Sequence, residues 1–278
     1  MLRVFPLRLL RFLLPTMGLL SACVTPTERA ARLAGRAGFQ AEVASGKPFL
    51  HQVFAKWTGG DSLSIFIEGD GLPWIGQGRT VSKDPTPRRP LALELAARTP
   101  GSVVYLGRPC YFGARSDSTC ETRRWTSDRY SAATVASMAA VANRLAEGHA
   151  VTHITLVGYS GGGTLALLMA PGVHAVERVV TVAGNLDVAQ WTRYHGYEAL
   201  DGSLDPASQA PLGAAIEQWY LLGDRDLTVP PELERRYLER AAPERVLRFP
   251  TFDHRCCWAQ SWPRIWARIE GVAPVRPP

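Results

Sequence analysis

Short runs of apolar residues recur along the chain, each bounded by glycine, proline or polar residues. Runs of this kind predict buried strands. Their apolar character is nearly continuous rather than alternating, which is typical of a parallel sheet covered on both faces. The predicted strands are Phe49–Trp57, Ser62–Glu68, Ser102–Leu106, His153–Val157, Arg178–Ala183, Gln218–Leu222 and Arg245–Phe249.

Helical periodicity occurs between these runs. It is strongest over Ser131–Glu147, where apolar residues recur at helical spacing. Because strands and helices alternate, we expect an α/β fold with a mostly parallel sheet and helices on both faces. The other predicted helices are Glu28–Ala37, Arg89–Ala97, Thr164–Ala170, Pro231–Ala241 and Trp258–Glu270.

One segment, residues 188–215, interrupts this alternation. It carries aromatic residues between Trp191 and Tyr197, followed by glycine and prolines. A stretch of this length is too long for an ordinary loop. We therefore expect a small insertion, or lid, over one end of the sheet, within a single domain that spans residues 49–278.

Composition supports a globular chain with a large core. Of the 278 residues, 46% are hydrophobic and 20% are charged, which argues against a disordered protein. The net charge is +6, but Arg3, Arg8 and Arg11 lie in the first 22 residues, and without them it falls to 6 − 3 = +3. No dense run of lysine or arginine remains, so we expect no nucleic-acid partner.

The N-terminus has the features of an export signal, with basic residues, a short hydrophobic stretch and then small residues. Leu20-Ser21-Ala22-Cys23 resembles the bacterial lipobox, in which the cysteine becomes the lipid-modified first residue. The resemblance implies a signal peptide at residues 1–22, lipidation of Cys23 by chains such as palmitate, and a linker with an N-terminal helix at 23–48. Val24, in place of an aspartate, implies the outer membrane, facing the periplasm. The alternative is a plain secretory signal with a chance cysteine.

Export changes how the other cysteines are interpreted. Cys110 and Cys120 lie ten residues apart in a polar loop, and an oxidising compartment favours a disulfide between them. Cys256 and Cys257 are adjacent, which leaves a vicinal disulfide, two buried thiols, or pairing with the other two cysteines. Neither pair has the C-x-x-C spacing of a zinc site, so we expect no metal.

Residues 158–162, Gly158-Tyr159-Ser160-Gly161-Gly162, fit the pattern G-x-S-x-G. The motif stands between a predicted strand and a predicted helix, as a nucleophile elbow requires. There, a serine lies at the tip of a sharp turn with its hydroxyl exposed, and its neighbours must be small for the strand and the helix to pack around it. Ser160 is therefore the candidate nucleophile.

A serine nucleophile needs a base and a group that orients the base. His254 stands in the loop between the last predicted strand and the final helix, and we interpret it as the base. Asp226 follows the strand Gln218–Leu222 in the run GDRDLTVP, and we interpret it as the acid. Asp187, after the preceding strand, is the alternative acid.

Over roughly residues 50–270, these motifs together resemble the α/β-hydrolase superfamily. In that family, G-x-x-D-x-x-V-P after the penultimate strand is the usual acid loop, and the histidine follows the last strand. The family order of serine, acid and histidine matches Ser160, Asp226 and His254. The resemblance implies the α/β-hydrolase fold and a catalytic triad of these three residues.

The resemblance also implies an oxyanion hole formed by the N–H groups of Gly161 and Asp70. Each such donor typically contributes about 3–4 kcal/mol to lowering the barrier. The loop reads Glu68-Gly69-Asp70-Gly71, where many relatives have His-Gly-x. An aspartate beside a developing negative charge opposes catalysis unless its side chain turns away or is paired.

The loop 107–130 is expected to edge the same pocket. Its arginines Arg123, Arg124 and Arg129 either bind a carboxylate or phosphate of a substrate or pair with nearby acids. For Arg123 and Arg124, we favour a solvated surface or pairing with acids.

The sequence therefore predicts a lipid-anchored, envelope-facing serine hydrolase that acts on an ester or other acyl substrate and needs no cofactor. A carboxylic ester is the expected substrate, with a thioester or a peptide as alternatives. The rival hypothesis is a non-catalytic envelope lipoprotein that uses the same fold as a binding scaffold. A third hypothesis is a redox protein that uses Cys256 and Cys257.

Overall fold

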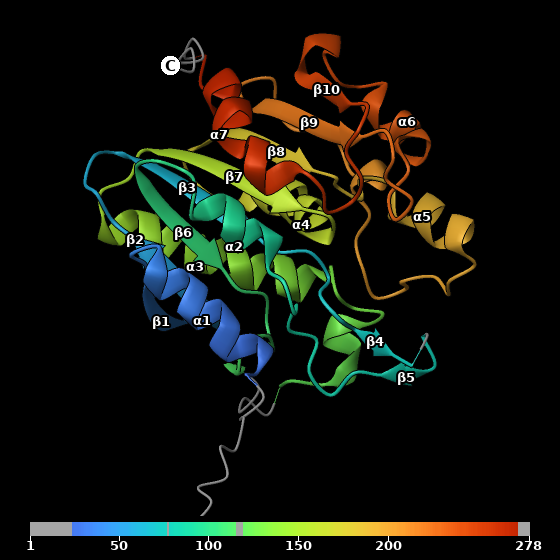
Figure 1. Cartoon of the computed structure of the whole chain (residues 1–278), viewed down its shortest axis with the longest axis horizontal. Coiled ribbons are helices and arrows are strands. Elements are labelled where there is room, and N and C mark those ends of the chain that lie inside the picture. The colour runs from blue at the N-terminus through green and yellow to red at the C-terminus, as the bar shows by residue number, and fades with distance from the viewer. Residues whose placement is uncertain (1–23, 77, 115–118, 272–278) are drawn as a thin grey trace, which may run out of the picture.

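The computed structural model describes residues 24–76, 78–114 and 119–271. An eight-stranded sheet lies at its centre. Its strands are β1 (Gln40–Ser45), β2 (Leu50–Lys56), β3 (Ser62–Ile67), β6 (Ser102–Leu106), β7 (His153–Tyr159), β8 (Val176–Val182), β9 (Glu217–Gly223) and β10 (Val246–Phe249). They lie in the order β1-β2-β6-β3-β7-β8-β9-β10 (Figure 1). The pairs β1–β2 and β2–β6 are antiparallel and all other neighbours are parallel, which confirms the predicted mostly parallel sheet.

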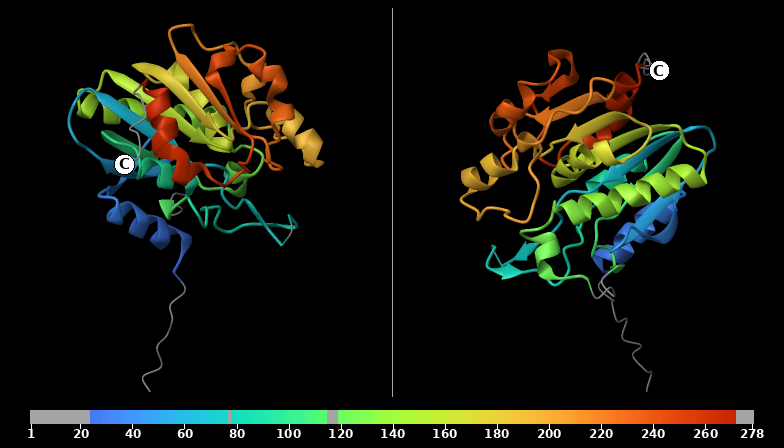
Figure 2. Two further views of the ribbon diagram at one scale, coloured as in Figure 1. Left: turned by 45° about the horizontal axis from the view of Figure 1, so that its top comes forward. Right: turned by 180° about the vertical axis from the view of Figure 1, so that it is seen from behind.

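Helices cover both faces of this sheet, as the sequence predicts. They are α1 (Pro26–Arg36), α2 (Leu91–Ala96), α3 (Ala132–Gly148), α4 (Gly161–Met169), α5 (Val188–His195), α6 (Arg235–Leu238) and α7 (Trp258–Ile269). Helices α1, α2 and α7 pack on one face, and α3 and α4 pack on the other (Figures 1 and 2).

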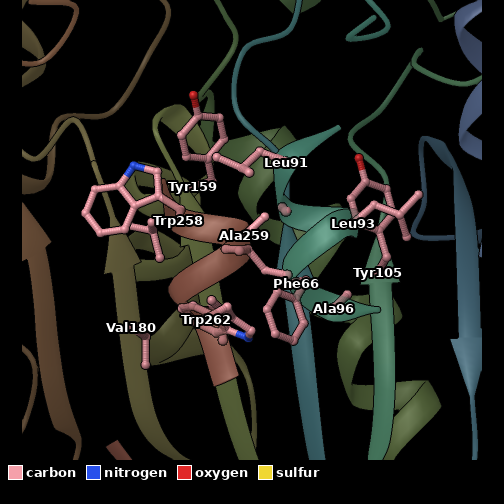
Figure 3. Close-up of a cluster of buried hydrophobic side chains, with 14 of the residues drawn as sticks. Phe66, Leu91, Leu93, Ala96, Tyr105, Tyr159, Val180, Trp258, Ala259 and Trp262 are labelled. Carbon is pink, nitrogen blue, oxygen red and sulfur yellow. The ribbon is translucent and has the colours of Figure 1, made fainter. Parts of the chain in front are cut away.

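Each central strand contributes side chains to both of the resulting cores. On β3, Leu63, Ile65 and Ile67 pack under α3 and α4, whereas Phe66 packs under α2 and α7. Figure 3 shows this second core, where Phe66 lies beside Trp262 of α7 and the aliphatic residues of α2. Both faces of its second half are buried, and there the sequence, Ile65-Phe66-Ile67, is continuously apolar.

The structure differs from the sequence-based expectation in three elements. Strand β1 lies in the segment expected to be a linker, and it pairs with β2 along its whole length. A hairpin of β4 (Trp74–Ile75) and β5 (Thr80–Val81) was not expected. The single helix expected at Pro231–Ala241 is instead a 3₁₀ turn, Pro231–Glu234, followed by the short α6.

Among the described residues, no helix is both long enough and apolar enough to cross a membrane. The signal peptide predicted at residues 1–22 and the lipidated cysteine predicted at Cys23 lie outside the described residues.

Candidate active site

Ser160 occupies the sharp turn between β7 and α4. Its backbone has φ 53° and ψ −124°, a region that residues with a Cβ rarely adopt. The flanking glycines allow this turn, because a Cβ on Gly158 would collide with the backbone of Gly162, and a Cβ on Gly162 would collide with the carbonyl oxygen of Ile67. The elbow therefore places the serine side chain above the carboxyl end of the sheet in a strained but well-supported conformation.

The structure brings Ser160, His254 and Asp226 together in one hydrogen-bonded chain. His254 Nδ1 lies 2.7 Å from Asp226 Oδ2, and His254 Nε2 lies 3.1 Å from Ser160 Oγ. An ionised carboxylate only accepts hydrogen bonds, so Nδ1 carries the proton and Nε2 accepts from the serine hydroxyl. This is the arrangement in which a neutral imidazole can take a proton from a serine.

The backbone of its own loop holds the Asp226 carboxylate in place. The N–H groups of Thr228 and Val229 both donate to Asp226 Oδ1 at 2.8 Å, which leaves Oδ2 for the imidazole. Thr228 is in turn tied to the insertion 188–215, because Trp191 Nε1 and His195 Nε2 donate to its carbonyl oxygen at 2.7 and 2.8 Å. The acid loop and the insertion are thus directly connected.

Asp187, the alternative acid, has a different role in the structure. Its Oδ1 accepts a hydrogen bond from the N–H of Gln190 at 2.9 Å and so caps α5. Its Oδ2 forms an ion pair with Arg236 Nε at 2.7 Å. Both oxygens are therefore engaged away from His254.

Two backbone N–H groups beside Ser160 are available to bind a ligand. Within the described part of the chain, neither the Gly161 N–H nor the Asp70 N–H donates a hydrogen bond. Gly161 opens α4, whose N-terminal end favours negative charge. The Asp70 loop lies against the nucleophile, since a Cβ on Gly69 would come within 3.1 Å of Ser160 Cβ. These are the two donors expected from the sequence.

The side chain of Asp70 is paired with two arginines. Arg108 Nη1 lies 2.6 Å from Asp70 Oδ1, and Arg129 Nη1 lies 2.8 Å from Oδ2. The Tyr130 hydroxyl donates to the same carboxylate at 2.7 Å. Burial raises the pKa of Asp70, but the charges of Arg129 and Arg108 outweigh it and hold the pKa well below the usual range. The site therefore has a net positive charge next to the two free N–H groups.

Arg108 is a functional candidate that the sequence analysis did not identify. It is almost fully buried, and its Nη2 also donates to the Arg129 carbonyl oxygen at 3.1 Å. Its only local signal in the sequence is its place two residues after a predicted strand, at the start of the predicted disulfide loop. This place does not reveal which acid the arginine pairs with. In contrast, Arg123 and Arg124 pair with Asp128 at 3.5 Å.

Glu68 lies below the same loop and is buried among elements of the sheet and α2. Its carboxylate accepts hydrogen bonds from the N–H of Ala92 at 3.1 Å and from the Tyr105 hydroxyl at 3.4 Å. Burial raises the pKa of Glu68 to about 8, against the lowering effect of the N–H groups of Gly69 and Ala92. At neutral pH this side chain is therefore largely uncharged.

Both pairs of cysteines are joined in the structure. Cys110 and Cys120 form a disulfide with a Cα–Cα distance of 5.5 Å, in the loop whose Tyr111 hydroxyl donates to the Asp70 carbonyl oxygen. Cys256 and Cys257 form a vicinal disulfide two residues beyond His254. Of the three alternatives that the sequence left open for these two cysteines, the structure has the first.

Ser160 and His254 open into a cavity of about 1220 Å³. The loop 68–74, the loop that leads into α2, and residues 196–200 of the insertion line it. Among the described residues, no group of three or more histidine, cysteine, aspartate or glutamate side chains is placed to hold a metal ion. The cavity is large enough for a drug-sized ligand.

No protein-family model and no curated protein sequence matches this chain. Solved structures do match. An α/β serine hydrolase from Xanthomonas campestris, described as having no lid, aligns with 86% of this chain and 97% of its own, at a TM-score of 0.53 and 13% identity. An esterase/lipase from an uncultured bacterium aligns with 91% of this chain and 92% of its own, at a TM-score of 0.53 and 12% identity. A puromycin hydrolase variant aligns with 87% of this chain but only 41% of its own, at a TM-score of 0.55 and 18% identity. The chain therefore has the α/β-hydrolase fold.

Proposed function

We propose that this chain is a serine hydrolase that cleaves carboxylic esters through an acyl-enzyme intermediate. The observation that carries the proposal is the chain of hydrogen bonds from Asp226 through His254 to Ser160, beside two backbone N–H groups without an acceptor. The fold shared with a serine hydrolase and an esterase/lipase supports an ester as the substrate class.

In the proposed reaction, Ser160 Oγ attacks the ester carbonyl carbon while His254 Nε2 takes the hydroxyl proton. Asp226 holds the imidazole in position and stabilises its positive charge. The imidazolium then donates its proton to the departing alcohol, which leaves an acyl group on Ser160. His254 then takes a proton from a water molecule, which attacks this acyl group. The imidazolium returns that proton to Ser160 Oγ as the acid is released.

The N–H groups of Gly161 and Asp70 would stabilise the negative charge on the carbonyl oxygen, at about 3–4 kcal/mol for each donor. The sequence raised the concern that the Asp70 carboxylate would oppose this charge. Its pairing with Arg108 and Arg129 removes that objection, because the three groups together carry a net positive charge.

We also propose that lipid at Cys23 anchors the protein in the bacterial envelope, at the outer membrane and facing the periplasm. The lipobox-like run that ends at Cys23 supports this proposal. No cofactor takes part in the proposed reaction.

The test is hydrolysis of p-nitrophenyl esters of increasing acyl length by the full chain in detergent, beside Ser160→Ala. We expect Ser160→Ala to lower kcat at least about a thousandfold, because the serine is the attacking group. Ser208→Ala, which changes an exposed serine outside the cavity, serves as the matched control and should leave kcat unchanged.

A fluorophosphonate probe gives an independent readout, because it labels only an activated serine. We expect labelling of the wild type and of Ser208→Ala, and none of Ser160→Ala. A folded wild type that neither turns over esters nor takes the label would refute the hydrolase proposal and favour the non-catalytic scaffold.

A further inference from the structure

Three arginine side chains border the cavity that contains Ser160 and His254. Arg88 and Arg89 belong to the loop that leads into α2, and Arg255 directly follows His254. All three are exposed. Arg255 Nη2 donates to the Arg89 carbonyl oxygen at 3.2 Å, so the two loops hold their cations at the same edge of the cavity. We call these three residues the arginine cluster.

Within the described part of the chain, no side chain of the arginine cluster forms an ion pair with a carboxylate. The nearest acid in sequence, Asp253, accepts a hydrogen bond from the backbone N–H of Arg255 at 2.7 Å. Other arginines are paired: Arg129 with Asp70, and Arg236 with Asp187. Arg129, which also lines the cavity, is thus paired, whereas the three guanidinium groups of the cluster form no ion pair.

The acids that line the cavity do not neutralise the cluster. Asp70 is already engaged by Arg129 and by Arg108. Burial raises the pKa of Glu68 to about 8, which leaves it largely uncharged at neutral pH. The third acid that lines the cavity, Glu198, is exposed. The cavity lining therefore contains four arginines and two charged carboxylates, an excess of two positive charges among the residues that line it.

The remainder of the wall includes aromatic side chains. Trp74, Tyr159, Trp191 and Tyr197 line the cavity together with Leu72 and Leu200. Such a wall accommodates an apolar part of a ligand, while guanidinium groups bind oxoanions through paired N–H donors.

We propose that the substrate carries an anionic oxygen group, a phosphate or a carboxylate, which the arginine cluster binds while the scissile ester lies at Ser160. This inference rests on the proposed hydrolase function and narrows it to anionic esters with an apolar portion. The anionic group belongs either to a small water-soluble ester or to a lipid headgroup, and the experiment separates these two sources.

The first measurement is binding of phenyl phosphate to the full chain carrying Ser160→Ala, by titration calorimetry. We expect binding that weakens at least tenfold when Arg88→Gln, Arg89→Gln and Arg255→Gln are added. The matched control adds Arg29→Gln, Arg264→Gln and Arg268→Gln, three exposed cations outside the cavity, and should keep the affinity. The proposal would be overturned if phenyl phosphate did not bind, or if it bound equally well to both triple variants. This holds for any result of the ester measurements.

The second measurement compares mono-p-nitrophenyl adipate, which bears a free carboxylate, with the uncharged p-nitrophenyl hexanoate. We expect the ratio of kcat/KM for the anionic ester to that for the neutral ester to fall about 10- to 100-fold in the cluster triple variant. The control triple variant should keep the wild-type ratio. A wild type that prefers the neutral ester, with a ratio that the cluster variant does not change, contradicts the proposal.

Vesicles of phosphatidylglycerol and of phosphatidylcholine identify the source of the anion. Cleavage of phosphatidylglycerol that depends on the cluster assigns the site to an anionic lipid headgroup, and cleavage of the adipate alone assigns it to a small ester. If phenyl phosphate binds through the cluster but no ester is cleaved, the hydrolase proposal fails and the anion site stands.

Discussion

The Asp70 carboxylate lies against the first residue of α4, in contact with Gly161. It has two cationic partners, whose side chains are only 1% and 6% exposed in Arg108 and Arg129. These ion pairs hold the Asp70 side chain beside the residue that follows the candidate nucleophile. A single carboxylate therefore pairs with two buried cations, and the three groups together keep a net positive charge.

We expect Asp70→Asn to lower the free energy of unfolding by about 3–5 kcal/mol, because it leaves two buried guanidinium groups without a counter-charge. Ester turnover should also fall, since the loop that carries the Asp70 N–H loses its ion pairs. Urea denaturation and p-nitrophenyl ester kinetics measure the two effects. Asp84→Asn is the matched control, because the Asp84 side chain accepts only from the nearby Thr86 N–H and should cost less than about 1 kcal/mol. Equal losses in both variants would contradict this role for Asp70.

Residue-level motifs were enough to identify the candidate nucleophile, base and acid. Ser160, Asp226 and His254 each lie in a short segment whose neighbours reveal their place after a strand. The partners of Asp70 could not be identified this way, because they lie 38 and 59 residues away in sequence. A pairing across such distances depends on the fold, which places the loops after β3 and β6 side by side.

At the scale of elements, Glu68 connects β3, α2 and β6. It directly follows β3, accepts from the Ala92 N–H in α2, and accepts from the Tyr105 hydroxyl of β6. The residue that precedes α2, Pro90, makes no side-chain capping bond. The Glu68 carboxylate therefore serves as a cap supplied by another element.

Because burial raises the pKa of Glu68 from 4.5 to about 8, the folded state holds a proton that the unfolded state has lost between these pH values. Its contribution to stability therefore falls as pH rises from about 4.5 to 8 and is constant above that. We expect Glu68→Gln, which cannot ionise, to gain about 2–5 kcal/mol relative to the wild type across this range.

Urea denaturation of both proteins at pH 5, 6.5 and 8.5 measures this difference in the free energy of unfolding. The other titrating groups are the same in both proteins, so their contributions cancel in the difference. Glu239→Gln changes an exposed side chain and should follow the wild-type profile. A difference between Glu68→Gln and the wild type that is constant with pH would show that Glu68 does not titrate as described.

The elements with buried apolar faces were the ones that the sequence could predict. Strand β6 was predicted with its observed bounds, and all five of its residues are buried. Strand β1 was missed because most of its residues are exposed at the edge of the sheet, which leaves no apolar run to recognise. The hairpin β4–β5 has only two residues in each strand, too few for a periodic pattern.

At the scale of the whole molecule, the beginning of α1 and the cavity lie at the same edge of the sheet. The first turn of α1 lies close to Gly113, in the loop after β6 that also carries Arg108. The beginning of α1 and the β4–β5 hairpin lie on the same side of the molecule in Figure 1. Cys23, the residue proposed to carry the lipid, is three residues before Pro26 in the sequence. An anchored molecule would therefore hold its cavity near the membrane surface.

We expect Cys23→Ser to abolish incorporation of an alkyne-tagged palmitate and to release the protein from the membrane fraction of the producing bacterium. Turnover of a water-soluble ester should not change, because the proposed reaction gives Cys23 no role. Fluorescence of the tag after electrophoresis measures the label. A wild type that carries no label and is found in the soluble fraction would refute the anchor and leave the plain secretory signal.

The hydrogen bonds at Thr228 have a consequence for how a ligand enters. Its carbonyl oxygen receives two donors from α5, and its N–H binds the carboxylate that orients His254. A ligand that displaces α5 in order to enter the cavity therefore removes two of the contacts that hold the acid loop. The same two hydrogen bonds therefore connect the wall of the cavity to the orientation of the imidazole.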